Sequence, residues 1–171
     1  MSDPTEGTTL VIGCGNLLGA DDGVGLNALE RLRAWDLPPD VELADGGTWG
    51  LNLLPLIERA TRVLLMDAVK TGADPGSLTT LERDQIPRFL STKVSPHQID
   101  LREVLALAEF RGTLPQETVV IGIEPERIEM SADLSPAVAE RVDDLVLAAV
   151  ERLRTWGHRV PLPVEVGACT S

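Results

Sequence analysis

The chain has 171 residues, of which 43% are hydrophobic and 25% charged, so its composition is that of one globular domain and not of a disordered chain. Its 15 Lys and Arg residues against 27 Asp and Glu residues give a net charge of −12, which excludes nucleic acid and anionic membranes as good partners and favours a basic or metal-bearing partner. No apolar run approaches the roughly 20 residues that span a bilayer, the acidic N-terminus is not a signal peptide, and the two cysteines form no disulfide scaffold. We therefore expect no membrane insertion and a cytoplasmic location.

The predicted elements alternate between strand and helix. In chain order they are a strand at 9–12, a helix at 23–33, a strand at 41–44, a short helix that Thr48 caps and Pro55 bends, a strand at 63–66, a weaker strand at 78–81, a helix at 98–110, a strand at 119–123 and one helix from Ser135 to Trp156.

This alternation indicates a mainly parallel sheet that helices cover on both faces. The segment at 63–66 is continuously apolar, which is typical of a strand buried on both faces. We predict an α/β fold with a three-layer, doubly wound sheet of about five strands and right-handed connections. The single domain is expected at 8–158, between a flexible N-terminus at 1–7 and a loose tail at 159–171.

The loop after the first predicted strand, from Gly13 to Gly23, is rich in glycine and suggests a dinucleotide site. Its third glycine, however, comes one position too late for the GxGxxG pattern. A pyrophosphate also needs the bare positive end of a helix, which here carries Asp21 and Asp22. We therefore predict no nucleotide cofactor. One of the two aspartates is expected to cap the helix, and the other, Asp22, to face the crevice above the sheet.

Ligands of doubly wound sheets bind outside the carboxyl ends of the strands, where the strand order reverses. Asp22 follows the first strand and Asp67 ends the third, so the two carboxylates should meet there. Asp45 ends the second strand and would lie near the rim, although a turn residue before Gly46 and Gly47 is the stronger interpretation. His97 is the only histidine positioned to join them. Two carboxylates and an imidazole suit zinc, nickel, manganese or iron, yet each side chain alone also fits a structural role.

Nucleophile hypotheses are weaker. No GxSxG motif exists, and Ser95 is too close to His97 in the chain to face it usefully. Cys14 with His97 and an aspartate could form a thiol triad, but a small buried residue at a strand end is the favoured interpretation. His158 is expected to be exposed or to act as a charge at a helix end.

Five short segments follow one another over residues 8–155: 12–18 (IGCGNLL), 21–25 (DDGVG), 45–48 (DGGT), 66–68 (MDA) and 95–98 (SPHQ). Their order and spacing resemble those of the hydrogenase maturation proteases, the endopeptidases that trim the C-terminus of the large subunit of nickel–iron hydrogenases. The resemblance implies a five-stranded sheet with one antiparallel strand, the fourth.

The same resemblance implies that Asp22, Asp67 and His97 bind metal and, together with Asp45, form the catalytic set. The implied activity is a single cut near the C-terminus of the large-subunit precursor, and the metal is the nickel that this precursor carries. Family members have Glu or Asp at the position of Asp22, so the shorter side chain here reaches about one methylene less far. The alternatives are a non-catalytic metal-sensing chaperone for the same partner and an unrelated metal-dependent peptidase of small substrates.

Overall fold

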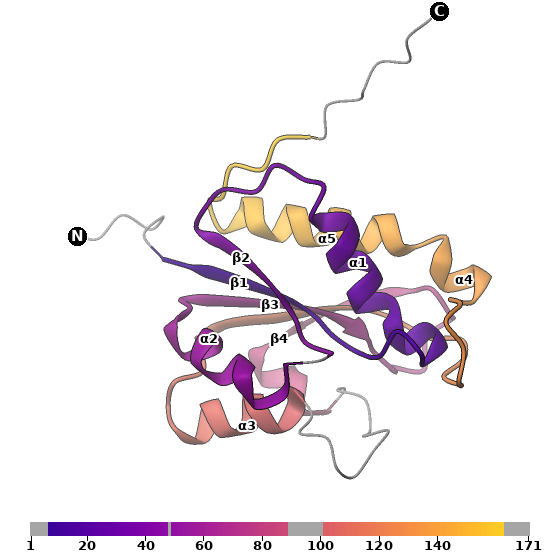
Figure 1. Cartoon of the computed structure of the whole chain (residues 1–171), viewed down its shortest axis with the longest axis horizontal. Helices are drawn as coiled ribbons and strands as arrows, with labels where there is room; N and C mark the ends of the chain where they lie inside the picture. The colour runs from indigo at the N-terminus through magenta and orange to yellow at the C-terminus, as the bar shows by residue number, and fades with distance from the viewer. Residues whose placement is uncertain (1–6, 48, 89–100, 163–171) are drawn as a thin grey trace, which may run out of the picture.

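The computed structural model describes residues 7–47, 49–88 and 101–162, which form a sheet between two layers of helices (Figure 1). The strands are β1 (Thr9–Gly13), β2 (Val41–Asp45), β3 (Arg62–Ala68), β4 (Leu78–Glu82) and β5 (Glu117–Ile123). The helices are α1 (Val24–Leu32), α2 (Leu53–Arg59), α3 (Leu101–Phe110), α4 (Pro136–Ala139) and α5 (Val142–Thr155). Three short 3₁₀ segments are η1 (Ala20–Gly23), η2 (Gly50–Asn52) and η3 (Arg83–Arg88).

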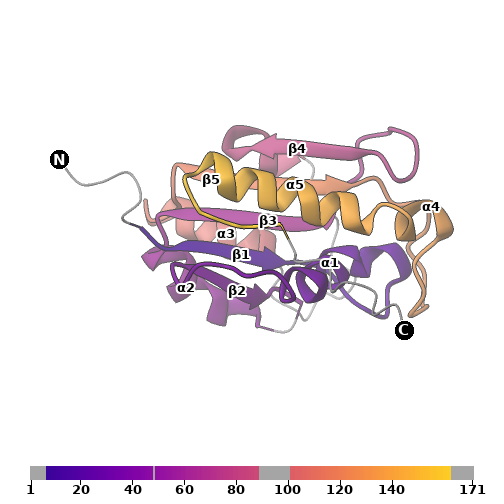
Figure 2. The same ribbon diagram turned by 90° about the horizontal axis from the view of Figure 1, so that it is seen from above.

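The sheet has five strands in the order β2-β1-β3-β5-β4 (Figure 2). β1 pairs in parallel with β2 and β3, and β3 pairs in parallel with β5. β4 is antiparallel to β5 at the sheet edge. These pairings confirm the predicted fold class, including the antiparallel fourth strand. The strand order reverses between β1 and β3, so the loops that follow these two strands lie at the position where a doubly wound sheet binds its ligand.

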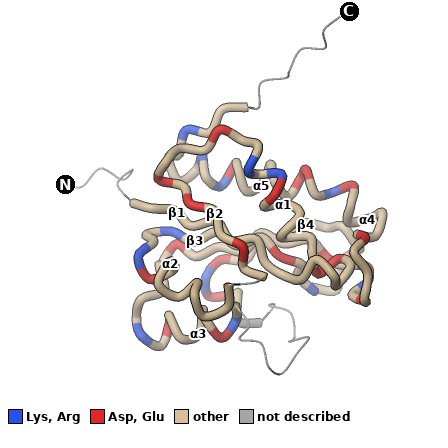
Figure 3. Tube along the Cα trace, in the orientation of Figure 1, with Lys and Arg blue, Asp and Glu red and all other residues tan. Residues whose placement is uncertain are grey.

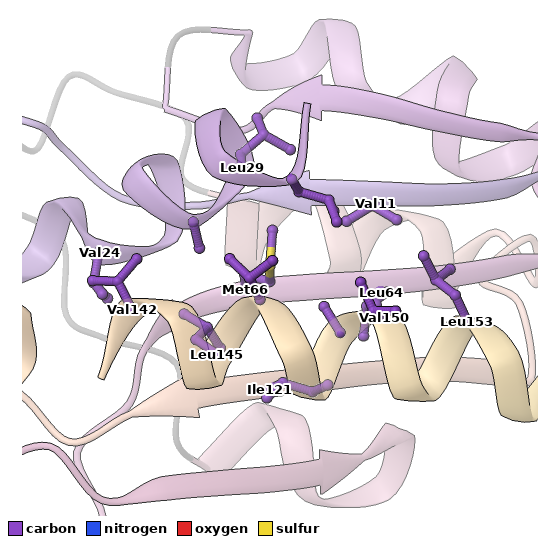
Figure 4. Packing of buried hydrophobic residues seen from close by; sticks show 14 of the residues in the cluster. Val11, Val24, Leu29, Leu64, Met66, Ile121, Val142, Leu145, Val150 and Leu153 are labelled. Carbon is purple, nitrogen blue, oxygen red and sulfur yellow. The ribbon is translucent and has the colours of Figure 1, made fainter. Parts of the chain in front are cut away.

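Helices cover both faces of the sheet: α1 and α5 lie on one side and α2 and α3 on the other (Figure 1). Successive residues of β3 alternate between the two cores, because side chains of a strand point to opposite faces. Leu64 and Met66 pack beneath α5 (Figure 4), and Leu65 packs in the core beside α2 and α3. The prediction that β3 is buried on both faces is thus confirmed.

The predicted single helix from Ser135 to Trp156 is wrong, because the chain turns at Glu140 and Arg141 and forms two helices, α4 and α5. Val138 before the break and Val142 after it are both fully buried in the same core. The apolar spacing therefore runs through the break, which explains why hydrophobic periodicity does not reveal it.

Some predictions fall outside the described residues: Thr48 as a cap, the first turn of the helix at 98–110, Ser95, His97 and the second of the two cysteines, Cys169. Among the described helices, none combines the length and the apolar character that crossing a membrane requires. Most charged residues lie on helices and connections, whereas β1 carries none (Figure 3).

Candidate active site

The candidate site lies at the carboxyl edge of β2, β1 and β3. Gly13, the last residue of β1, pairs with Asp45 on one side and with Met66 on the other. Asp67 follows Met66 directly, and the loop that carries Asp22 continues from Gly13. The three predicted carboxylates therefore occupy the ends of neighbouring strands and the loop between them.

Backbone hydrogen bonds within the loop after β1 hold its first residues close to Asp22. The N–H of Asn16 donates to the carbonyl of Asp22 at 3.3 Å, and the N–H of Asp22 donates to the carbonyl of Gly19 at 3.2 Å. Gly15 has a φ of +106°, and a Cβ there would lie 1.8 Å from the Asp22 carbonyl oxygen, so only glycine fits. A Cβ on Gly19 would lie 3.3 Å from Oδ2 of Asp22, so the carboxylate lies over this loop. Asp22 is only 6% exposed.

Neither aspartate caps α1. The residue at the N-cap position is Gly23, and no side chain accepts a hydrogen bond there. The prediction that one aspartate caps this helix is therefore wrong. The reason is that Asp21 is fully buried and its carboxylate is used elsewhere, on backbone groups of the segment 126–135.

Burial acts to raise the pKa of Asp21, but the hydrogen bonds from Arg127, Ser135 and Glu126 together outweigh it and hold the pKa below its ordinary value. Asp21 is therefore ionised at neutral pH, and its charge is compensated by backbone dipoles.

Asp67 is also buried, with 5% exposure, and its Oδ1 accepts the N–H of Ala68 at 2.8 Å. Asp45 is half-buried, and its Oδ1 accepts the N–H of Gly47 at 2.8 Å. This second contact is the Asx turn expected of an aspartate before two glycines. Asp45 is thus the most accessible of the three carboxylates.

α1 approaches the strand ends very closely at Gly25. A Cβ on Gly25 would lie 2.1 Å from the carbonyl oxygen of Met66 and 2.6 Å from that of Cys14. Cys14 is 3% exposed, and its Sγ lies 3.7 Å from the carbonyl oxygen of Ile12. The thiol is therefore a packed group at the end of β1, as the favoured sequence interpretation expects.

Within the described part of the chain, no three His, Cys, Asp or Glu side chains are grouped closely enough to hold a metal ion. The predicted third ligand, His97, lies outside the described residues, so the set of Asp22, Asp67 and His97 stays a prediction.

The second histidine, His158, is buried and not exposed, which corrects the sequence prediction. Its Nδ1 lies 3.2 Å from Asp40 Oδ2, and its Nε2 lies 2.7 Å from Thr9 Oγ1. A carboxylate only accepts, so Nδ1 carries the proton, and Nε2 of the neutral ring accepts the threonine hydroxyl. Burial lowers the pKa of His158, Asp40 acts to raise it, and Arg62 lowers it further. Thr9 begins β1, so this histidine lies at the opposite edge from the candidate site.

The sequence interpretation missed the segment 126–135 as part of the site. The segment contacts the loop after β1 through Asp21, which lies more than 100 residues away in the chain. The N-cap signal at Ser135 is visible in the sequence, but nothing in that signal identifies Asp21 as its partner.

Comparison with known proteins gives one consistent result. A family model described as hydrogenase maturation protease, HycI, matches residues 26–152. The chain is 42% identical over 154 residues to the hydrogenase expression/formation protein HupD of Rhodobacter capsulatus, a match that covers 88% of this chain and 73% of the relative. It is 32% identical over 150 residues to the hydrogenase 2 maturation protease of Escherichia coli, covering 86% and 92% of the two chains.

The fold has solved counterparts as well. The hydrogenase maturating endopeptidase HybD from E. coli superposes with a TM-score of 0.81 at 31% identity, over 90% of this chain and 96% of that chain. A [NiFe] hydrogenase maturation protease HycI from Thermococcus kodakarensis superposes with a TM-score of 0.67 at 25% identity, over 88% and 95%.

Proposed function

Because the chain belongs to the hydrogenase maturation protease family, we propose that it removes the C-terminal extension of a nickel–iron hydrogenase large-subunit precursor after nickel has been inserted. The chain is a peptide-cleaving enzyme, as its relatives named proteases and endopeptidases are. This membership favours an enzyme over a metal-sensing chaperone, and a protein precursor over small peptides.

We assign Asp22, Asp67 and His97 to recognition of the nickel that the precursor carries. The observation that supports this assignment is the strand register, in which the end of β1 pairs with the end of β3 so that the Asp22 loop and Asp67 share one edge. Two carboxylates and an imidazole are a donor set suited to nickel. Bound at the scissile bond, the nickel of the substrate would polarise the carbonyl group or the attacking water.

We assign Asp45 as the general base, because it is the most accessible carboxylate of this edge. In this step a water molecule adds to the scissile carbonyl carbon and its proton passes to the Asp45 carboxylate. The C–N bond then breaks, and the same proton passes to the leaving amine. Atoms and charge balance without a protein nucleophile, in agreement with the buried position of Cys14.

The test is incubation of nickel-loaded and nickel-free precursor with this protein, followed by intact-mass measurement. We expect shortening of the nickel-loaded precursor alone. Asp67→Asn should abolish most of this shortening, whereas Asp84→Asn, an exposed carboxylate at the opposite edge, should leave it unchanged. Equal shortening of both precursors would refute nickel recognition, and shortening of neither would refute the proposed substrate.

A further inference from the structure

One buried carboxylate near the site takes no part in the proposed chemistry. Asp21 is fully buried, yet its oxygens accept hydrogen bonds from groups that all belong to the segment 126–135. The N–H groups of Glu126 and Arg127 donate to Oδ2 at 2.9 and 3.0 Å, and the hydroxyl of Ser135 donates to Oδ2 at 2.8 Å. The N–H of Ser135 donates to Oδ1 at 2.7 Å. A single side chain thus joins both ends of a ten-residue segment to the loop after β1.

Backbone hydrogen bonds join the same two segments. The N–H of Ala20 donates to the Ser131 carbonyl at 2.7 Å, that of Asp21 to the Arg127 carbonyl at 3.2 Å, and that of Ser131 to the Leu18 carbonyl at 3.0 Å. In Figure 2 the two segments accordingly lie side by side near α4. The contact is therefore a continuous one with the Asp21 carboxylate at its centre.

The loop is strained where this contact begins. Ala20 has a φ of +55°, and it is the one non-glycine residue with positive φ in the described part of the chain. Such a conformation persists only where its surroundings enforce it, and strain of this kind clusters at functional sites. Ala20 lies directly before Asp21, and Asp22 follows at the next position. The contact with 126–135 therefore fixes the backbone from which the Asp22 side chain extends.

We propose that Asp21 is a positioning residue, whose hydrogen bonds to the segment 126–135 hold the Asp22 carboxylate where it meets the substrate. The proposal rests on the proposed function, because it needs Asp22 to touch the substrate. It goes beyond that function by making a buried neighbour and a distant segment part of the working site.

Asp21→Asn is the first variant to measure, because it keeps the shape of the side chain. The N–H₂ group of the amide takes the place of one acceptor oxygen and faces an N–H donor in either orientation. The hydrogen bond from Arg127 or the one from the Ser135 N–H is therefore lost. Displacement of a reacting group by about 1 Å costs on the order of 100-fold in rate, and we expect a loss of kcat of about that size for nickel-loaded precursor.

Ser135 provides the graded variants. Ser135→Ala removes one of the hydrogen bonds to Asp21, and we expect kcat to fall about two- to tenfold. Ser135→Thr retains the hydroxyl and remains a good helix N-cap, so it should restore cleavage. This rescue identifies the hydrogen bond, and not the size of the side chain, as the property that matters. If Asp21→Asn fails to fold, the Ser135 pair decides the question alone.

A loss of stability alone must be separated from misplacement of Asp22. Thr9→Ala serves as the control, because it removes a buried hydrogen bond at the opposite edge of the sheet. All rates are measured well below each melting temperature, so the melting curve gives the folded fraction. Thr9→Ala should keep its kcat per folded molecule, whereas Asp21→Asn should not.

A double-mutant cycle tests whether Asp21 acts through Asp22. In the Asp22→Glu background, which should keep partial cleavage, Asp21→Asn should cost clearly less than in the wild type, because coupled residues are non-additive. Full additivity, or a normal kcat in folded Asp21→Asn protein, overturns the proposal and leaves the proposed function intact. Absence of cleavage by the wild-type protein overturns the proposed function first.

Discussion

Asp21 and Asp22 are chemically identical neighbours, but their side chains have different surroundings. Asp21 turns toward backbone donors of the segment 126–135, whereas Asp22 lies over the loop from Gly15 to Gly19. Both carboxylates are buried, and the difference between them lies in the groups that each one contacts.

The role of Asp22 is tested by two substitutions with opposite expectations. Asp22→Asn keeps the shape and loses the charge, so processing of nickel-loaded precursor should fall at least 100-fold if the carboxylate meets the metal, on the order of a lost transition-state contact. Asp22→Glu keeps the charge and lengthens the reach, so it should retain partial activity. The measurement is intact mass of the precursor against time, with circular dichroism as the control for folding. Normal processing by folded Asp22→Asn protein would remove Asp22 from the site.

For Cys14, in contrast to Asp22, we expect substitution to leave processing almost unchanged. Its thiol is packed at the end of β1 and contacts a backbone carbonyl, so Cys14→Ser should process precursor at close to the wild-type rate. The variant is compared with wild type in the same time course, after thermal melting has shown that it is folded. Complete loss of processing would restore the thiol-protease hypothesis.

Sequence alone predicts which candidate carboxylates lie at the ends of strands. Asp45 and Asp67 end apolar segments, and topology brings such ends together. The roles of Asp21 and His158 are not predictable in this way, because their partners lie 105 to 149 residues away and depend on how the helices pack. Sequence shows the residue type at these positions but not the groups it meets.

At the scale of elements, α1 reaches the strand ends only because residue 25 lacks a side chain. Gly25→Ala places a methyl group 2.1 Å from the Met66 carbonyl oxygen, which backbone cannot accommodate without movement of the helix. We expect a loss of about 3 kcal/mol of unfolding free energy, the upper range for overpacking, measured by urea denaturation. Gly23→Ala in the adjoining turn is the comparison, since its nearest contact is 3.0 Å and its loss should be smaller. Equal losses of unfolding free energy in the two variants would contradict the close approach of α1 to the strand ends.

His158 ties the segment after α5 to the start of β1, and this link depends on pH. Its pKa is lowered in the folded state, so above about pH 6.5 both states are neutral and the full contribution is present. As the pH falls below that value, the unfolded chain takes up the proton first and the folded state loses stability. The difference in unfolding free energy between wild type and His158→Gln should therefore decrease as the pH is lowered from about 7.5 to 5.5. A constant or widening gap in urea midpoints would contradict the buried neutral ring.

Burial decides which helices and strands can be predicted from the sequence. Apolar strands such as β3 and β5 are recognised within a few residues, because burial on both faces leaves a continuous apolar run. The turn between α4 and α5 escapes prediction, because Val138 and Val142 keep helical spacing across it. The hydrophobic pattern indicates which face of a helix is buried, but it does not reveal a local break in the backbone.

At the scale of the whole molecule, the net charge of −12 should attract a basic or metal-bearing segment of the precursor. Raising the ionic strength from about 0.01 to 0.15 M shortens the screening length from about 30 to 8 Å. We expect kcat/KM to fall over this range mainly through a higher KM, with kcat nearly constant. Steady-state cleavage at several salt concentrations gives kcat and KM. A KM that is independent of salt would exclude electrostatic attraction of the precursor.

The strand order has a consequence for the timing of synthesis. β4 pairs with β5 alone within the described sheet, and β5 is also the second neighbour of β3. A chain emerging from the ribosome therefore carries β4 for about 35 residues of elongation, some seconds of translation, before its partner strand exists. The loop that bears Asp22 remains without its contacts for longer still, because Ser135, which donates hydrogen bonds to Asp21, is translated after β5. Asp21 and Asp22 are thus translated more than 100 residues before Ser135, so a nascent chain that ends before Ser135 lacks the hydrogen bonds that hold this loop.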